Sequence, residues 1–136
     1  NSRNEGKVAA WRGLAFEDLC ANHVDKIKDA LKVGGVLSQE TSLTVRGDEE
    51  DRGTQIDLII IRNDNIVNLC EMKFTTQPFV IDKEYHDLLL HRIDKLRECL
   101  KDDNKSIHLT FVTSRGVKQN MYSGIVQNEV TLDDLF

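Results

Sequence analysis

Two carboxylates and a lysine stand close together on two predicted neighbouring strands. Asp57 begins an apolar run, and Glu71 and Lys73 end the next apolar segment along the chain. If a three-residue loop joins the strands, Arg62 faces Ile66 and Asp57 faces Glu71, with Cβ atoms about 4.5–5.5 Å apart. Lys73 lies two residues beyond Glu71 and therefore points to the same side of the sheet.

This arrangement of charges predicts a metal site. Like charges placed opposite each other destabilise a sheet, so Asp57 and Glu71 require a compensating partner. A divalent cation that prefers oxygen ligands, Mg²⁺ with Mn²⁺ as its substitute, is the natural candidate. Such a metal activates water and polarises a phosphoryl oxygen, while Lys73 stabilises the negative charge that develops. The three side chains therefore predict the hydrolysis of phosphodiester bonds.

Two alternatives to this interpretation stay open. A two-residue loop would place Asp57 opposite Met72 and send Glu71 to the other face. A strand-end acid beside a lysine is also commonly a solvated ion pair, and the short pattern Glu71-Met72-Lys73 taken alone favours that explanation. Asp57 is harder to explain in this way, because carboxylates near buried strands rarely lack a partner.

A third acid, Glu17, belongs to a predicted amphipathic helix. Between residues 8 and 31, apolar side chains recur at spacings of three and four from Phe16 to Leu31. Glu17 borders this apolar stripe, so it is placed to approach the sheet. A solvated helix-surface glutamate is the alternative and, for Glu17 alone, the more common case.

The rest of the chain predicts an α/β domain. The expected order is helix, three strands, helix and strand, followed by a short appendage. A second helix begins after Asp82, a good N-cap residue. Strands are expected at 36–45, 56–61, 66–73, 106–113 and 125–130, with a capping box at 131–134 that predicts a last helical turn. No linker divides the chain, so residues 1–136 are expected to form a single domain.

Composition limits the class of protein. Hydrophobic residues make up 40% of the chain, and no apolar run approaches the roughly 20 residues of a membrane span. The charge of −5 argues against binding nucleic acid by positive charge alone, although metal-binding carboxylates count as negative until the metal arrives. Three well-separated cysteines, Cys20, Cys70 and Cys99, predict reduced core residues of a cytoplasmic protein.

Together these residues resemble the PD-(D/E)XK nuclease superfamily, and within it the Holliday-junction-resolvase-like branch. The resemblance rests on three segments: Gly13-Leu14-Ala15-Phe16-Glu17, Gly53-Thr54-Gln55-Ile56-Asp57 and Glu71-Met72-Lys73. It implies a restriction-endonuclease-like fold, a mixed central sheet flanked by helices, that cleaves DNA, branched DNA included. By the resemblance, Lys73, Glu71 and Asp57 are catalytic, and Mg²⁺ is bound by Glu17, Asp57, Glu71 and the backbone carbonyl of Met72. Ile56 replaces the proline of the family motif.

A narrower resemblance covers residues 55–74, 78–85 and 122–136. These segments are similar to the C-terminal nuclease-like domain of prokaryotic P-loop (AAA-type) ATPases. The resemblance implies an ATPase domain upstream, and the absence of an initial methionine fits a piece excised from a longer chain. No Walker A pattern occurs in the sequence. An alternative function is a catalytically idle module that binds a partner or regulates the ATPase. The sequence leaves the oligomeric state open.

Overall fold

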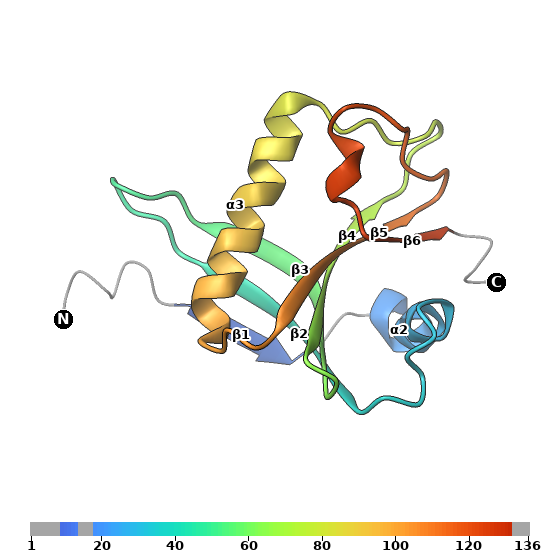
Figure 1. The fold of residues 1–136 in the computed structure, drawn as a ribbon, viewed down its shortest axis with the longest axis horizontal. Coiled ribbons are helices and arrows are strands. Elements are labelled where there is room, and N and C mark those ends of the chain that lie inside the picture. The colour runs from blue at the N-terminus through green and yellow to red at the C-terminus, as the bar shows by residue number, and fades with distance from the viewer. Residues whose placement is uncertain (1–8, 14–17, 132–136) are drawn as a thin grey trace.

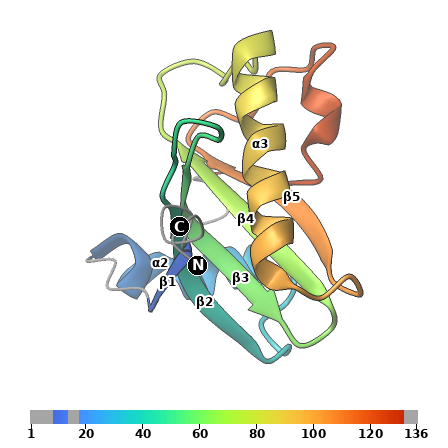
Figure 2. The same cartoon turned by 90° about the vertical axis from the view of Figure 1, so that its left-hand side faces the viewer.

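One mixed sheet with a helix on each face forms the described part of the chain. The computed structural model describes the backbone of residues 9–13 and 18–131 and the side chains of residues 24–131 (Figure 1). Figures 1 and 2 show the two α-helices, α2 and α3, on opposite faces of the sheet. The elements in chain order are β1 Ala9–Gly13, α2 Asp18–Ala30, β2 Ser38–Val45, β3 Thr54–Arg62, β4 Ile66–Lys73, α3 Lys83–Leu100, β5 Ser106–Thr113, the 3₁₀ turn η1 Ser123–Ile125 and β6 Asn128–Thr131.

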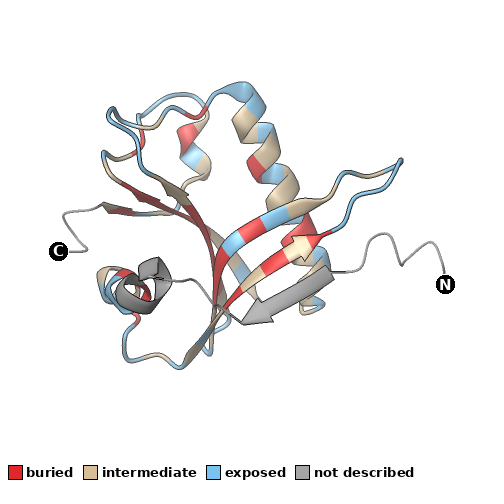
Figure 3. Ribbon diagram, turned by 180° about the vertical axis from the view of Figure 1, so that it is seen from behind, coloured by how far each residue is buried: buried red, intermediate tan, exposed pale blue. Residues whose placement is uncertain are grey.

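The six strands lie in the sheet in the order in which they occur in the chain. Adjacent strands from β1 to β4 are antiparallel, and β5 and β6 are added in parallel to β4. The parallel step follows from α3, because a parallel pair needs a crossover long enough to return the chain to the same end. Buried residues line both faces of the central strands (Figure 3). The mixed α/β fold that the sequence predicts is therefore confirmed.

Several predicted elements appear at their expected positions. The strands predicted at 66–73 and 106–113 have these bounds in the structure. The side chain of Asp82 caps α3, accepting a hydrogen bond from the backbone N–H of Tyr85 at 2.8 Å. Helix α3 ends at Leu100, and its C-cap residue Lys101 adopts a left-handed conformation with φ 56°. Cys70 is buried in the core and Cys99 packs partly buried against it, as predicted, while the side chain of Cys20 lies outside the described residues.

The beginning of the predicted first helix is wrong. Residues 9–13 form strand β1, which pairs with β2 from Ala9 opposite Val45 to Gly13 opposite Thr41. Backbone hydrogen bonds to the edge of the sheet override the weak helical preference of so short a segment. The final strand lies at 128–131, three residues later than its predicted start, and residues 132–134 of the predicted capping box lie outside the described residues.

Strand β3 contains a β-bulge next to the predicted site. Its pairing with β2 shifts between Ile56 and Ile59, so that Asp57 and Leu58 together oppose a single residue of β2. Ile56 and Ile59 both pack in the core beneath α3, whereas Leu58 packs in the core beneath α2. The bulge therefore breaks the simple alternation of side chains along β3 at Asp57.

Candidate functional site

The β3–β4 hairpin has the register that the sequence predicts. Antiparallel pairs run from Leu58 opposite Cys70 to Ile61 opposite Val67, as a three-residue loop requires. The alternative with a two-residue loop is thereby excluded. The strand pairs end at Leu58 and Cys70, one residue before Asp57 and Glu71. The local structure at these two acids therefore decides where their carboxylates point.

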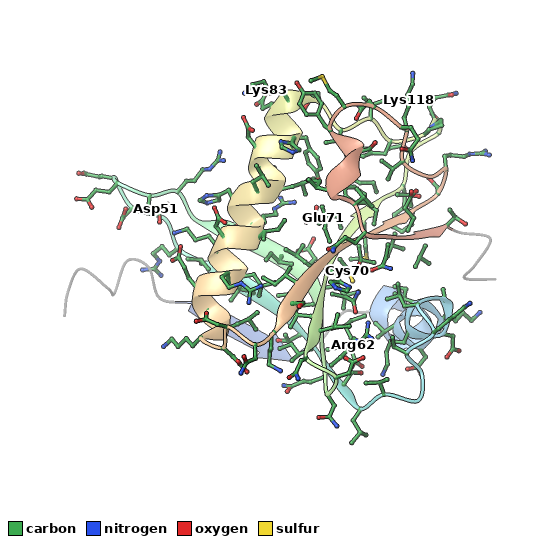
Figure 4. The ribbon with its side chains drawn as sticks, in the orientation of Figure 1. Asp51, Arg62, Cys70, Glu71, Lys83 and Lys118 are labelled. Carbon is green, nitrogen blue, oxygen red and sulfur yellow. The ribbon has the colours of Figure 1, made fainter. Side chains whose placement is uncertain are left out.

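Glu71 points toward α3. In β4 it follows Leu69, which belongs to the core beneath α3, at a spacing of two. Its Oε1 atom accepts two hydrogen bonds from α3, one from the Tyr85 hydroxyl at 2.8 Å and one from Nη1 of Arg92 at 2.6 Å. Only 7% of the Glu71 side chain is exposed. Figure 4 labels Glu71 on the side of the sheet that carries α3. The carboxylate is thus buried against the helix and paired with an internal cation.

Asp57 points to the other face. It is exposed, and its Oδ1 accepts a hydrogen bond from Nε2 of Gln55 at 3.0 Å. Gln55 adjoins Ile56, which faces the core beneath α3, so Gln55 and Asp57 share the opposite face. The prediction that Asp57 and Glu71 are cross-strand partners on one face is wrong, and the bulge is the physical reason.

Only part of the predicted Mg²⁺ ligand set lies among the described residues. Glu17 lies outside the described residues, and the Met72 backbone belongs to β4, where it pairs with β5 at Val112. Among residues 24–131, no three histidine, cysteine, aspartate or glutamate side chains lie close enough to hold a metal ion. A divalent cation needs several oxygen ligands on one side, whereas Asp57 and Glu71 diverge.

Lys73 lies with Glu71 on the face that carries α3. Its Nζ atom is 4.9 Å from the centroid of the Tyr85 ring and 5.5 Å from that of Phe79, both within the range of a cation–π interaction. Tyr85 thus contacts both Glu71 and Lys73, the two charged residues of the E-x-K pattern. A pocket of about 470 Å³ opens here, lined by Arg52, Lys73, Phe79, Val80, Asp82, Glu84, Tyr85 and Leu88.

Hydrogen bonds from His91 and Lys95 of α3 hold the β2–β3 loop beside this pocket. The ring Nε2 of His91 lies 3.1 Å from the backbone carbonyl oxygen of Arg52, to which it donates as the Nε2–H tautomer. The Nζ atom of Lys95, buried on the same helix, donates to the carboxylate of Asp51. Contacts from α3, a distant segment of the chain, therefore position Arg52 at the pocket. The residues around Arg52 in the sequence do not predict these contacts.

The sequence identified Glu71 and Lys73 but missed what surrounds them. Neither Tyr85 nor Arg92 is among the predicted catalytic or metal-binding residues. The available signal was their spacing of seven, because residues two helical turns apart lie on the same side of a helix. The spacing alone does not say which strand residue the two side chains meet.

Burial raises the pKa of the Tyr85 hydroxyl, and the negative charge of Glu71 together with the hydrogen bond to it raises this pKa further. In a Tyr122→Phe variant, which leaves Tyr85 as the remaining tyrosine, tyrosinate absorbance is expected to rise only well above pH ~10, the ordinary tyrosine value. The pKa of Tyr85 is higher in the folded protein than in the unfolded chain. The neutral hydroxyl therefore stabilises the folded protein fully below pH ~10, and this stabilisation is lost as the pH rises through the raised pKa. Adding Glu71→Gln should move the absorbance rise to lower pH, and an unchanged titration would contradict the contact.

Comparison with protein-family models, with curated proteins and with solved structures gave no match. Within the described residues, no helix is long and apolar enough to cross a membrane.

Proposed function

We propose that this domain is a module of restriction-endonuclease-like fold that does not cleave DNA, and that it binds a partner or regulates an ATPase joined to it. The observation that carries the proposal is the state of Glu71. Its carboxylate is turned away from Asp57 and is bound by Arg92 at 2.6 Å. Of these two acids, which the motif resemblance implies as metal ligands, Glu71 thus contacts α3 and Asp57 contacts Gln55.

The contacts of Glu71 with Arg92 and Tyr85 support a site without catalytic activity. Hydrolysis by a metal-bound water needs carboxylates that converge on the metal. Here the guanidinium of Arg92 already neutralises Glu71, and the hydroxyl of Tyr85 donates to the same oxygen. A buried carboxylate that is paired and hydrogen-bonded in this way contributes to the packing of α3 on the sheet.

The pocket beside Lys73 supports binding. It combines the cations Lys73 and Arg52 with the apolar side chains of Phe79, Val80 and Leu88. Val80 is 51% exposed, and Phe74, the residue after Lys73, is equally exposed. Exposed apolar side chains beside polar groups are typical of surfaces that contact a partner. We assign the binding role to this surface.

One observation favours a second candidate, a Mg²⁺-dependent DNA endonuclease. Glu71 and Lys73 share a face and both contact Tyr85 at an open pocket. In that case Glu17, Asp57 and Glu71 would bind the metal after the side chains of Asp57 and Arg92 have moved. The two candidates differ in one measurable property, which is cleavage.

A cleavage assay tests the proposal directly. The domain and the longer chain that contains it are incubated at low salt with Mg²⁺ or Mn²⁺ and with linear or branched DNA. We expect no metal-dependent cleavage above that of the matched Glu71→Gln variant, because the carboxylate is already paired. A change in the ATP hydrolysis rate of the longer chain on Lys73→Glu would support regulation. Cleavage that both Lys73→Ala and Glu71→Gln abolish would establish the endonuclease instead.

A further inference from the structure

In the described part of the chain, two cations line the pocket beside α3 without pairing with a carboxylate. No ion pair within residues 24–131 includes Lys73 or Arg52. Glu71, the acid of the same strand as Lys73, is bound by Arg92, and Lys73 lies over two aromatic rings instead. The pocket therefore offers two positive charges to an anion that comes from outside.

The walls of the pocket are apolar and firmly held. Phe79 packs edge to face against Tyr85, with ring centroids 5.2 Å apart, and its ring centroid is 5.8 Å from that of the buried Phe111. Val80 lines the same pocket and is 51% exposed, so the apolar wall continues onto the molecular surface. The volume of about 470 Å³ lies within the usual range for a binding pocket. It leaves room for large apolar side chains beside an anionic group, and the open wall favours a longer chain over a small molecule.

The charges around the pocket favour a single carboxylate over a polyanion. Asp82 and Glu84 line the pocket together with Lys73 and Arg52, so two acids offset the two cations. A DNA backbone carries many phosphates, and it would meet these acids on a chain whose net charge is −5. A single carboxylate needs only the two cations, and the apolar walls strengthen its attraction to them because they exclude water.

From these features we infer that the pocket binds a segment of a partner protein in which an aspartate or glutamate adjoins large apolar side chains. The carboxylate of that segment contacts Lys73 and Arg52. Its apolar side chains pack on Phe79, Val80 and Leu88. The inference rests on the proposed function, and it names the chemistry of the partner that the module binds.

Selection from a phage-displayed library of random heptapeptides, with the 136-residue chain as the immobilised target, tests this chemistry. The enriched peptides are expected to carry an aspartate or glutamate next to leucine, isoleucine or an aromatic residue. The most enriched peptide is then labelled with fluorescein, and its Kd is measured by fluorescence anisotropy. Lys73→Met and Arg52→Glu should each weaken binding at least about tenfold, the effect of losing one close charge pair at an interface.

Lys101→Glu is the matched control for Arg52→Glu, because it makes the same change of charge at an exposed position. Lys101 follows the C-terminal end of α3, whereas the helical residues of the pocket belong to its N-terminal half. Its effect on the Kd should stay within about twofold, since salt screens charges that lie more than about 10 Å apart. If Lys73→Met does not fold, Arg52→Glu decides alone, because Arg52 is exposed.

Three results would overturn the inference. One is a selection that enriches no peptides or only peptides without an acid, and another is a loss of binding in Lys101→Glu as large as in Arg52→Glu. The third is a labelled single-stranded DNA that binds the wild type at low salt and fails to bind Lys73→Met, which would assign the pocket to nucleic acid. DNA cleavage by the wild type would contradict the proposed function, whereas enriched peptides without acids contradict this inference alone.

Discussion

Replacing Phe111 with alanine is expected to lower the free energy of unfolding by about 3–5 kcal/mol, the range for a fully buried phenylalanine. Phe111 is 0% exposed and lies on β5 directly beside Glu71 of β4. Its ring centroid is 5.8 Å from that of Phe79, one of the two rings beneath Lys73. The alanine variant leaves a cavity beneath α3 that these rigid strands cannot close.

Urea denaturation measures this loss as a lower midpoint at an unchanged slope. Phe74→Ala is the matched control, since Phe74 is 51% exposed, and its effect should stay within about 0.5 kcal/mol. Equal losses in the two variants would mean that the core beneath α3 is not where the structure places it.

Replacing Arg92 with alanine in the absence of added metal is expected to cost about 3 kcal/mol, the lower end of the range for breaking a buried ion pair. The lower end applies because Arg92 retains 21% exposure, whereas the Glu71 carboxylate that is left behind is 7% exposed. Much of the cost is the burial of an unpaired charge rather than the loss of the contact itself.

A double-mutant cycle with Glu71→Gln separates these two parts. The double variant should be more stable than Arg92→Ala alone, because the glutamine carries no charge to desolvate. The exposed pair of Lys83 and Asp87, 3.1 Å apart, provides the comparison, and Lys83→Ala should lower the free energy of unfolding far less than Arg92→Ala does. Strictly additive effects of Arg92→Ala and Glu71→Gln would show that the two side chains do not interact.

Local chemistry in the sequence determined most of the elements and the register of the central hairpin. The loop Asn63-Asp64-Asn65 is an example, because asparagine tolerates the positive φ of 66° that Asn65 adopts. Apolar runs of the right length on both sides then allow one pairing, since a slip by one residue would turn their buried side chains to the wrong face. Asp82 determined the start of α3 in the same local way, through a hydrogen bond to a backbone N–H three residues on.

The tertiary structure alone decided which way the acids point and what they contact. The bulge at Asp57 depends on how β2 pairs with β3, and β2 is not adjacent to that residue in the sequence. The partner of Glu71 comes from α3, 21 residues later in the chain. Strand β1 likewise exists because β2 offers it an edge. A motif records residue types and spacing, but the direction of a side chain in a sheet depends on the strands paired on both sides and on the helix packed above, and these are set by long-range packing.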